Sequence, residues 1–247
     1  HKTPQRKKQG GLHRTLTILI MGATNLLAED FVMGPGDYYH GLGLDDYDTL
    51  LMAGGKIDGL NVNDYAVANI ENTNMPFGIG YLTTDGYGTL NLSGGNIGEI
   101  GSWSESVINI SCGNVNSLKM HHGSKLYLSG GSVNSLEMQH FSISYLSGGQ
   151  IGTLASDQTA FFPGDQPWDP GTYLYWIHIF CQPGYSYDDN TNMLSGQWRD
   201  GTAFNIQLQD IGDNPTYDLI VFHIPEPGTV VLLAIGGIFL KRRISKQ

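Results

Sequence analysis

Basic residues are scarce in this chain of 247 residues. Lysine and arginine together number 13, against 23 aspartates and glutamates, and the formal net charge is −10 at pH 7. Most of the cations lie at the two ends, so only Lys56, Lys119, Lys125 and Arg199 are spread over the middle. A surface of this sign repels the phosphates of nucleic acids and the charges of anionic polysaccharides. We therefore expect no nucleic acid partner.

Cysteine is nearly absent as well. Cys112 and Cys181 are enough for one disulfide in an oxidising compartment, but the sequence does not decide whether they pair. Cys112 stands where the sibling repeats described below carry glycine. That position favours a tolerated substitution over a bridge.

Familiar catalytic motifs are missing from the chain. It contains no Gly-x-Ser-x-Gly elbow, phosphate-binding loop or zinc protease motif. Parallel β-helices can be polysaccharide lyases or hydrolases, whose sites need clustered carboxylates and often a neighbouring cation. The carboxylates of the repeat region are scattered instead. We therefore expect a protein that is not an enzyme, with a polysaccharide-active enzyme as the least favoured alternative.

The sequence does have an internal repeat, with a period of 18 residues. Four segments align without gaps around a Ser-Gly-Gly or a variant of it. An earlier copy stands 40 residues upstream, which leaves room for one degenerate copy around Tyr65 to Gly80 and suggests about six rungs. The five clear copies are Leu50–Leu60, Leu90–Ile100, Ile108–Leu118, Leu126–Leu136 and Ser144–Leu154.

Apolar and polar residues alternate within each copy, which is the period of a β-strand, and the glycines then break the strand. One such unit cannot bury its apolar face, whereas stacked units can. The pattern predicts an all-β fold, a parallel β-solenoid with interior ladders of like residues. One predicted ladder is Leu92, Ile110, Leu128 and Leu146, and the other is Ile97, Val115, Val133 and Ile151.

Two other architectures fit the period less well. Eighteen residues equal three hexapeptides of a left-handed triangular β-helix, but the apolar positions do not recur every six residues. An irregular, right-handed solenoid is therefore favoured. A meander of hairpins is expected to lack a fixed period.

The last 24 residues carry a different signal. A Pro-Glu-Pro tripeptide is followed by an apolar run from Thr229 to Leu240 and then by three basic residues. As a helix the run would rise about 18 Å, short of the roughly 30 Å hydrocarbon core of a membrane. The basic cluster is expected on the cytoplasmic side. The residues that carry the pattern are Pro225, Glu226, Pro227, Lys241, Arg242 and Arg243.

This arrangement resembles the PEP-CTERM sorting signal of exported bacterial proteins, which exosortase-type membrane enzymes handle. The resemblance implies cleavage near Pro225, Glu226 and Pro227. It also implies a Gram-negative-type bacterium that makes extracellular polysaccharide, and a role in its envelope or matrix. A plain C-terminal membrane anchor and a buried core helix are the alternatives.

The N-terminal sequence also indicates export. A basic stretch to Arg14 precedes an apolar stretch from Leu16 to Leu27 and the small residue Ala28, which is the order of a secretory signal peptide. The alternative is a buried helix with a basic leader. We expect the protein to use the secretion machinery, to be anchored transiently in the membrane, and to reach the cell surface or the extracellular space.

These signals divide the chain into four parts. We predict a signal peptide over residues 1–28, the β-solenoid over 29–156, a small C-terminal β cap or linker domain over 157–223, and the sorting signal with a short transmembrane helix over 224–247. In the third part, residues 173–180, 203–208 and 217–222 are expected to be strands. Such a cap would protect the last rung from edge-to-edge pairing.

Histidines and acidic loops are the candidates for metal binding. His140 follows His122 by 18 residues, so the two are expected to stack and, with His121, could share a transition metal. A solvent-facing ladder is the alternative. Calcium is possible in the acidic loops at 45–48 and 188–190, although ordinary turns explain them too, and no other cofactor is expected.

Tyrosines offer a candidate glycan site. Tyr127 and Tyr145 are expected to stack on one outer face of the solenoid, in line with Asn91 and Asn109. Exposed aromatic rows can stack on sugar rings, although aromatic side chains more often serve packing. A carbohydrate-binding module that contacts extracellular polysaccharide is therefore the alternative to a structural scaffold.

Overall fold

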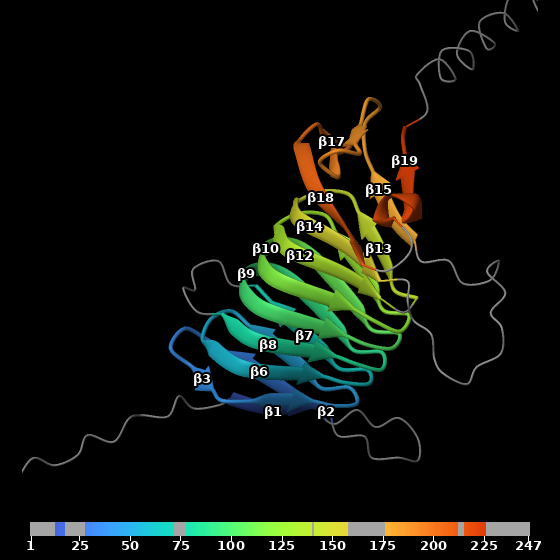
Figure 1. The fold of residues 1–247 in the computed structure, drawn as a ribbon. Coiled ribbons are helices and arrows are strands. Elements are labelled where there is room, and N and C mark those ends of the chain that lie inside the picture. Colours follow the sequence, from blue (N-terminus) through green and yellow to red (C-terminus); the bar gives the residue numbers. More distant parts are fainter. Residues whose placement is uncertain are drawn as a thin grey trace, which may run out of the picture.

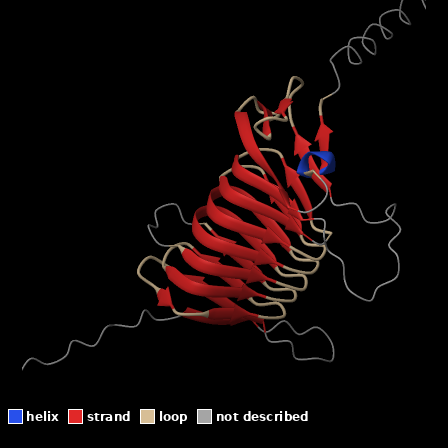
Figure 2. Ribbon diagram, viewed as in Figure 1, coloured by secondary structure: helices blue, strands red, loops and turns tan. Residues whose placement is uncertain are grey.

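The computed structural model describes residues 13–17, 28–71, 78–139, 141–157, 176–211 and 215–225. They form a parallel β-solenoid of about seven turns (Figure 1), which confirms the predicted all-β class and the repeat. Helix is almost absent from these residues: one short 3-10 helix, η1 (Thr216–Leu219), lies near the end (Figure 2).

Each turn contributes a strand to each of two parallel stacks. The first stack contains, in order, β2 (Ala28–Met33), β5 (Thr49–Met52), β7 (Val67–Ile70), the first parts of β9 (Thr89–Ser102) and β10 (Val107–Met120), then β11 (Lys125–Leu128), β13 (Ile143–Leu146), β15 (Trp176–Phe180) and β19 (Ile220–His223). The second stack contains β3 (Tyr38–Tyr39) and β4 (Leu42–Leu44), β6 (Lys56–Val62), β8 (Ile79–Thr84), the second parts of β9 and β10, β12 (Ser132–Gln139), β14 (Gln150–Asp157) and β18 (Ala203–Ile211).

Both predicted interior ladders are confirmed. In the first stack Ile110 pairs with Leu92 on one side and with Leu128 on the other, and Leu128 pairs with Leu146. All four side chains are at most 1% exposed. The second ladder has the corresponding pairs in the second stack, and its side chains are at most 3% exposed. The core is therefore a column of aliphatic side chains between the stacks, and its burial is the main stabilising term.

The number of turns is about seven rather than the predicted six or so. The additional turn comes first and consists of β2, β3 and β4, with Phe31, Met33 and Leu44 buried against the next turn. Its corner has the sequence Gly-Pro-Gly at 34–36 in place of Ser-Gly-Gly. The turn therefore could not be recognised from the repeat pattern. The degenerate copy is present where it was expected, as β7 and β8.

The corner between the two stacks explains the glycine pair of the repeat. The second glycine of each pair has a positive φ, for example +75° at Gly131 and +85° at Gly149. A Cβ at Gly131 would lie 2.6 Å from the carbonyl oxygen of Gly113 in the turn before it. Glycine is needed here for two reasons, the left-handed backbone and the close approach of neighbouring turns.

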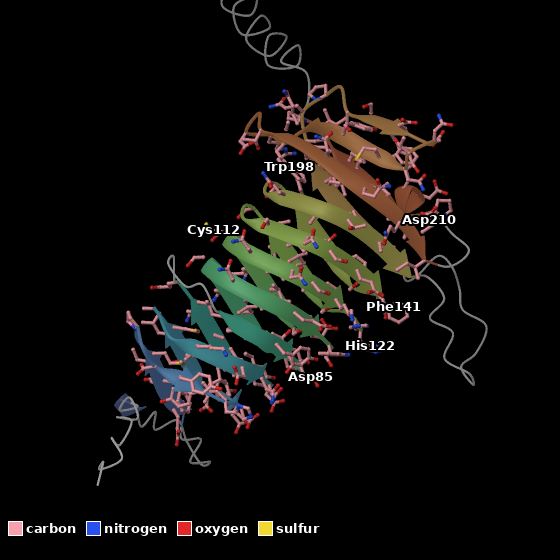
Figure 3. All side chains as sticks on the ribbon, turned by 60° about the vertical axis from the view of Figure 1, so that its left-hand side comes forward. Asp85, Cys112, His122, Phe141, Trp198 and Asp210 are labelled. Carbon is pink, nitrogen blue, oxygen red and sulfur yellow. The ribbon has the colours of Figure 1, made fainter. Side chains whose placement is uncertain are left out.

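Cys112 occupies the first position of such a pair and distorts its strand. At the equivalent Gly130, a Cβ would overlap the carbonyl oxygen of Ser111. The pairing of β9 with β10 shifts register on both sides of Cys112, and this side chain is exposed at the glycine edge (Figure 3). Cys181 is buried, and both thiols are free, so the two cysteines form no disulfide.

After β15 the chain adds an antiparallel unit to the end of the second stack. β16 (Ser186–Asp188) pairs with β17 (Met193–Gln197), and β17 pairs with β18, which stacks in parallel on β14. Two of the three strands expected here are β15 and β18, whereas the third segment begins as η1 and becomes β19.

The predicted terminal helices lie almost wholly outside the described residues. The described part of the N-terminal one forms β1 (His13–Thr17), a strand that pairs antiparallel with β2. Among the described residues, no helix is long and apolar enough to cross a membrane.

Candidate ligand-binding groove

Two adjoining hollows follow the outer face of the second stack. The first has a volume of about 500 Å³ and begins at Lys56 and Gly78, and the second has a volume of about 480 Å³ and reaches β18. Because both are lined by Ser132 and Asn134, they form one groove that crosses the strands. We call it the amide groove, after its lining residues Asn96, Asn114, Asn116, Asn134, Gln150 and Asn205.

The groove follows from one position of the repeat. The residue after each inward-facing residue of the second ladder points outward: it is Gly98 after Ile97 and Asn116 after Val115. At this position two successive turns present a bare backbone, at Gly80 and Gly98, and the next two present an amide side chain, at Asn116 and Asn134. A Cβ at Gly98 would overlap the carbonyl oxygen of Gly80, so close packing of two turns keeps this part of the floor free of side chains.

The amides of the groove bond from turn to turn. Asn114 donates from Nδ2 to Oδ1 of Asn96 at 2.8 Å, and Ser132 donates from Oγ to Oδ1 of Asn114 at 2.6 Å. Asn134 donates to Asn116 over a longer 3.5 Å. A side-chain amide has two N–H donors and an acceptor oxygen with two lone pairs. The ladder uses only part of this capacity for Asn114 and Asn116.

A charged cluster lies beside the start of the groove. Asp58 accepts a hydrogen bond from the Tyr38 hydroxyl, its Oδ2 lies 3.0 Å from Nδ1 of His40, and its Oδ1 lies 2.9 Å from Nζ of Lys56. The sequence alone did not indicate this cluster, because its members come from β3, β6 and the loop between β3 and β4. Only their outward positions on adjacent turns indicate it.

The pKa shifts in this cluster argue against proton transfer near neutral pH. The hydrogen bond from Lys56, followed by that from Tyr38, lowers the pKa of Asp58 far below its usual range. The same carboxylate raises the pKa of Lys56 and that of Tyr38. An effective general acid or base has a pKa near the working pH, and all three shifts move away from it. The cluster is therefore an ion-pair network.

The predicted histidine site is only partly within the described residues. The ring of His121 stacks on Trp103, with centroids 5.4 Å apart and an interplanar angle of 8°, and it lies 6.1 Å from the ring of His122. His122 occupies the edge opposite Cys112, in line with Asp85 and Phe141 (Figure 3). His140 lies outside the described residues. In the part of the chain that the structure describes, no group of three His, Cys, Asp or Glu side chains is placed to hold a metal ion.

The acidic loops use their carboxylates to stabilise turns. In the first loop Asp48 accepts hydrogen bonds from the backbone N–H groups of Glu29, at 2.8 Å, and Asp45, at 3.2 Å. In the second, Asp188 accepts from the N–H of Asn190 at 3.0 Å and from Thr191 Oγ1 at 2.9 Å. These bonds lower the pKa of Asp188. Calcium remains a prediction for both loops.

The predicted stack of Tyr127 and Tyr145 is present. Their ring centroids are 4.9 Å apart at an interplanar angle of 6°, on the outer face of the first stack. Tyr145 stacks equally closely on His178 with its other face. A sugar ring binds to an open aromatic face, and both faces of Tyr145 are covered. Tyr127 is 42% exposed, and a glycan site at these tyrosines stays a prediction. The stack continues the line of Asn91 and Asn109, whose amides bond at 2.8 Å.

The sorting residues begin at the end of the described chain. Pro225 is exposed and follows β19 after one residue, Ile224, which is 40% exposed. The remaining predicted residues, Glu226, Pro227, Lys241, Arg242 and Arg243, lie outside the described residues.

Comparison with known proteins gives no relative for this chain. No protein-family model matches it, and neither does any curated protein or solved structure.

Proposed function

We propose that this protein is an exported β-solenoid that acts as a structural or interaction scaffold at the cell surface or in the extracellular matrix, and that it is not an enzyme. A signal peptide over residues 1–28 would direct it to the secretion machinery. An exosortase-type enzyme would then process the tail at Pro225, Glu226 and Pro227, while the following apolar run holds the chain in the membrane.

One observation carries the proposal: the order of Pro-Glu-Pro, apolar run and basic cluster directly after the last strand of the solenoid. Ile224 and Pro225 are exposed there, so the start of the tripeptide is accessible to a processing enzyme. Proline also fixes an extended backbone that lacks an N–H donor, which disfavours pairing with β19.

A scaffold role fits the chemistry of the described residues. The polar ladders bond from turn to turn, and the pKa shifts around Asp58 oppose acid–base catalysis. We also propose that the antiparallel strands after β15 act as a cap, because an exposed last turn would invite pairing with another chain. An activity on uronic acid polymers that disappears in Asp58→Asn would instead make the protein an enzyme.

The test is the mass and the terminal sequences of the full chain after expression in a bacterium with an exosortase-type system. We expect loss of the residues before about Glu29 and after about Pro225, and retention of the tail in Glu226→Ala. Glu71→Ala is the matched control, because Glu71 is an exposed glutamate far along the chain from the tail. An intact C-terminus in the membrane fraction would leave a plain membrane anchor, and normal maturation of Glu226→Ala would show that the Pro-Glu-Pro tripeptide is not the signal that directs processing.

A further inference from the structure

The amide groove has a shape suited to a chain-like ligand. It crosses the outer side of β8, β9, β10, β12, β14 and β18, six strands of the second stack. At about 4.8 Å per strand this is a length of about 24 Å. The groove is open to solvent along its length, which suits a long polymer better than a compact small molecule.

Its lining combines amide side chains with aliphatic surface and carries almost no charge. Lys56 is the one charged residue among the described lining residues, and its Nζ is already paired with Asp58 at 2.9 Å. An anionic polymer would find no available cation in the groove, and the net charge of −10 would repel it. The lining instead offers amide donors and acceptors, which match the hydroxyl groups of a neutral ligand.

Amide donors lie on two successive turns. The second N–H of Asn114 and both N–H groups of Asn116 make no hydrogen bond within the described part of the chain, and the position of Asn116 carries an amide again one turn later, at Asn134. Amides one turn apart suit a ligand built from repeating units. The interval of about 4.8 Å between turns is close to the length of one sugar residue in an extended polysaccharide.

An extended peptide fits the groove less well. Peptides bind to β-structures mainly by adding a strand to an exposed edge, whereas the groove lies on a face whose strands are paired on both sides. Its floor at Gly80 and Gly98 provides no pockets that would select different side chains.

We propose that the amide groove binds a neutral, linear polysaccharide laid across the strands of the second stack. Asn114, Asn116 and Asn134 would hydrogen-bond to successive sugar hydroxyls, while the bare backbone of the glycines lets the chain lie close to the sheet. This site goes beyond the scaffold role and is independent of the sorting tail. The amide groove lies on the second stack, whereas the tyrosine pair Tyr127 and Tyr145 lies on the first.

The experiment is electrophoresis of the full chain through native gels that contain a neutral polymer: hydroxyethyl cellulose, a linear β-1,3-glucan or a galactomannan. We expect at least one of them to retard the protein, and at least a tenfold weaker retardation constant for the double variant Asn114→Ala/Asn116→Ala. Asn109→Ala is the matched control, because it removes the same amide from the same strand, β10, on the other stack. Melting curves establish that the variants are folded equally well.

Three results would overturn the proposal. The first is that none of the neutral polymers retards the protein. The second is that the double variant and Asn109→Ala are retarded alike. The third is stronger binding to polygalacturonate, or to a neutral peptide rich in serine and asparagine, than to any of the neutral glycans. Because binding and tail processing are measured on different variants, either idea can fail without the other.

Discussion

Trp198 donates its indole N–H to the carbonyl oxygen of Gly149 at 2.9 Å, across 49 positions of the sequence. Trp198 follows β17 and is fully buried, with its ring 4.5 Å from that of Phe204. Gly149 belongs to the last Gly-Gly corner of the repeat. This bond therefore fastens the antiparallel strands to the end of the repetitive solenoid.

Replacing Trp198 by Phe tests the importance of this attachment. The change removes the N–H, leaves the Gly149 carbonyl oxygen without its donor and opens a small cavity, so we expect a loss of about 2–4 kcal/mol in the free energy of unfolding. Chemical denaturation measures it. The control is Trp103→Phe, at a partly exposed tryptophan, with a loss of less than about 1 kcal/mol. Equal losses would mean that the buried bond contributes nothing.

Replacing Gly131 by Ala tests the Gly-Gly corner. The new methyl group would meet the carbonyl oxygen of Gly113 in a left-handed backbone, so we expect a destabilisation of about 2 kcal/mol or more, seen as a lower melting temperature. In Gly43→Ala the added Cβ has no atom within 4 Å, and the backbone is not left-handed, so its effect is expected to be small. A thermally neutral Gly131→Ala would contradict the close contact between turns.

The contact between His178 and His223 makes the last strand sensitive to acid. Their ring nitrogens Nδ1 and Nε2 are 2.8 Å apart, and burial, followed by the charge of His223, lowers the pKa of His178 below 6.5. As the pH falls, the unfolded chain takes up its proton first. The contribution of neutral His178 to the free energy of unfolding is therefore fully present above pH 6.5. It is lost as the pH falls from 6.5 towards the pKa of His178 in the folded protein.

The variant His178→Tyr removes this titration and keeps a ring that can stack on Tyr145. We compare the melting temperatures of the variant and the wild type at about pH 7.5 and at about pH 5.5, the range in which histidine titrates. The difference, variant minus wild type, is expected to be larger at the lower pH. A difference that does not change with pH would show that the pKa of His178 is the same in both states.

Two buried serines make a matched pair. Ser102 lies 2.7 Å from Ser106 and accepts a hydrogen bond from Thr84 at 3.0 Å, whereas the buried hydroxyl of Ser124 has no hydrogen-bond partner among the described residues. We expect Ser102→Ala to cost about 1–2 kcal/mol of unfolding free energy, and Ser124→Ala to be neutral or stabilising by up to about 1 kcal/mol. Denaturation curves measure both, and the reverse order would contradict the hydrogen-bond assignment.

The interior of the solenoid was predictable because two periods agree. The 18-residue spacing placed Ile110 under Leu128, and strand alternation turned both inward, so each ladder was correct residue by residue. The first turn was missed because its corner lacks the Ser-Gly-Gly signature, although Phe31 and Met33 fill the same column of the core.

The groove was missed for a different reason. Its residues, such as Gly98, Asn116 and Asn134, look like ordinary loop residues in the linear sequence, and their relation appears only when equivalent positions of successive turns are compared. The aromatic stack was predictable, because Tyr127 and Tyr145 are 18 residues apart and lie at equivalent outward positions of adjacent turns. A sugar-binding role for it stays a prediction.

Each central turn pairs only with the turn before it and the turn after it, at an interval of 18 residues. Duplication of one such unit in the gene would insert a complete turn with its core residues, its corner and its outward amides already matched to both neighbours. The protein would become longer by about 4.8 Å. Evolution can therefore change the length of the protein in equal steps of one turn, while the contacts between neighbouring turns stay the same.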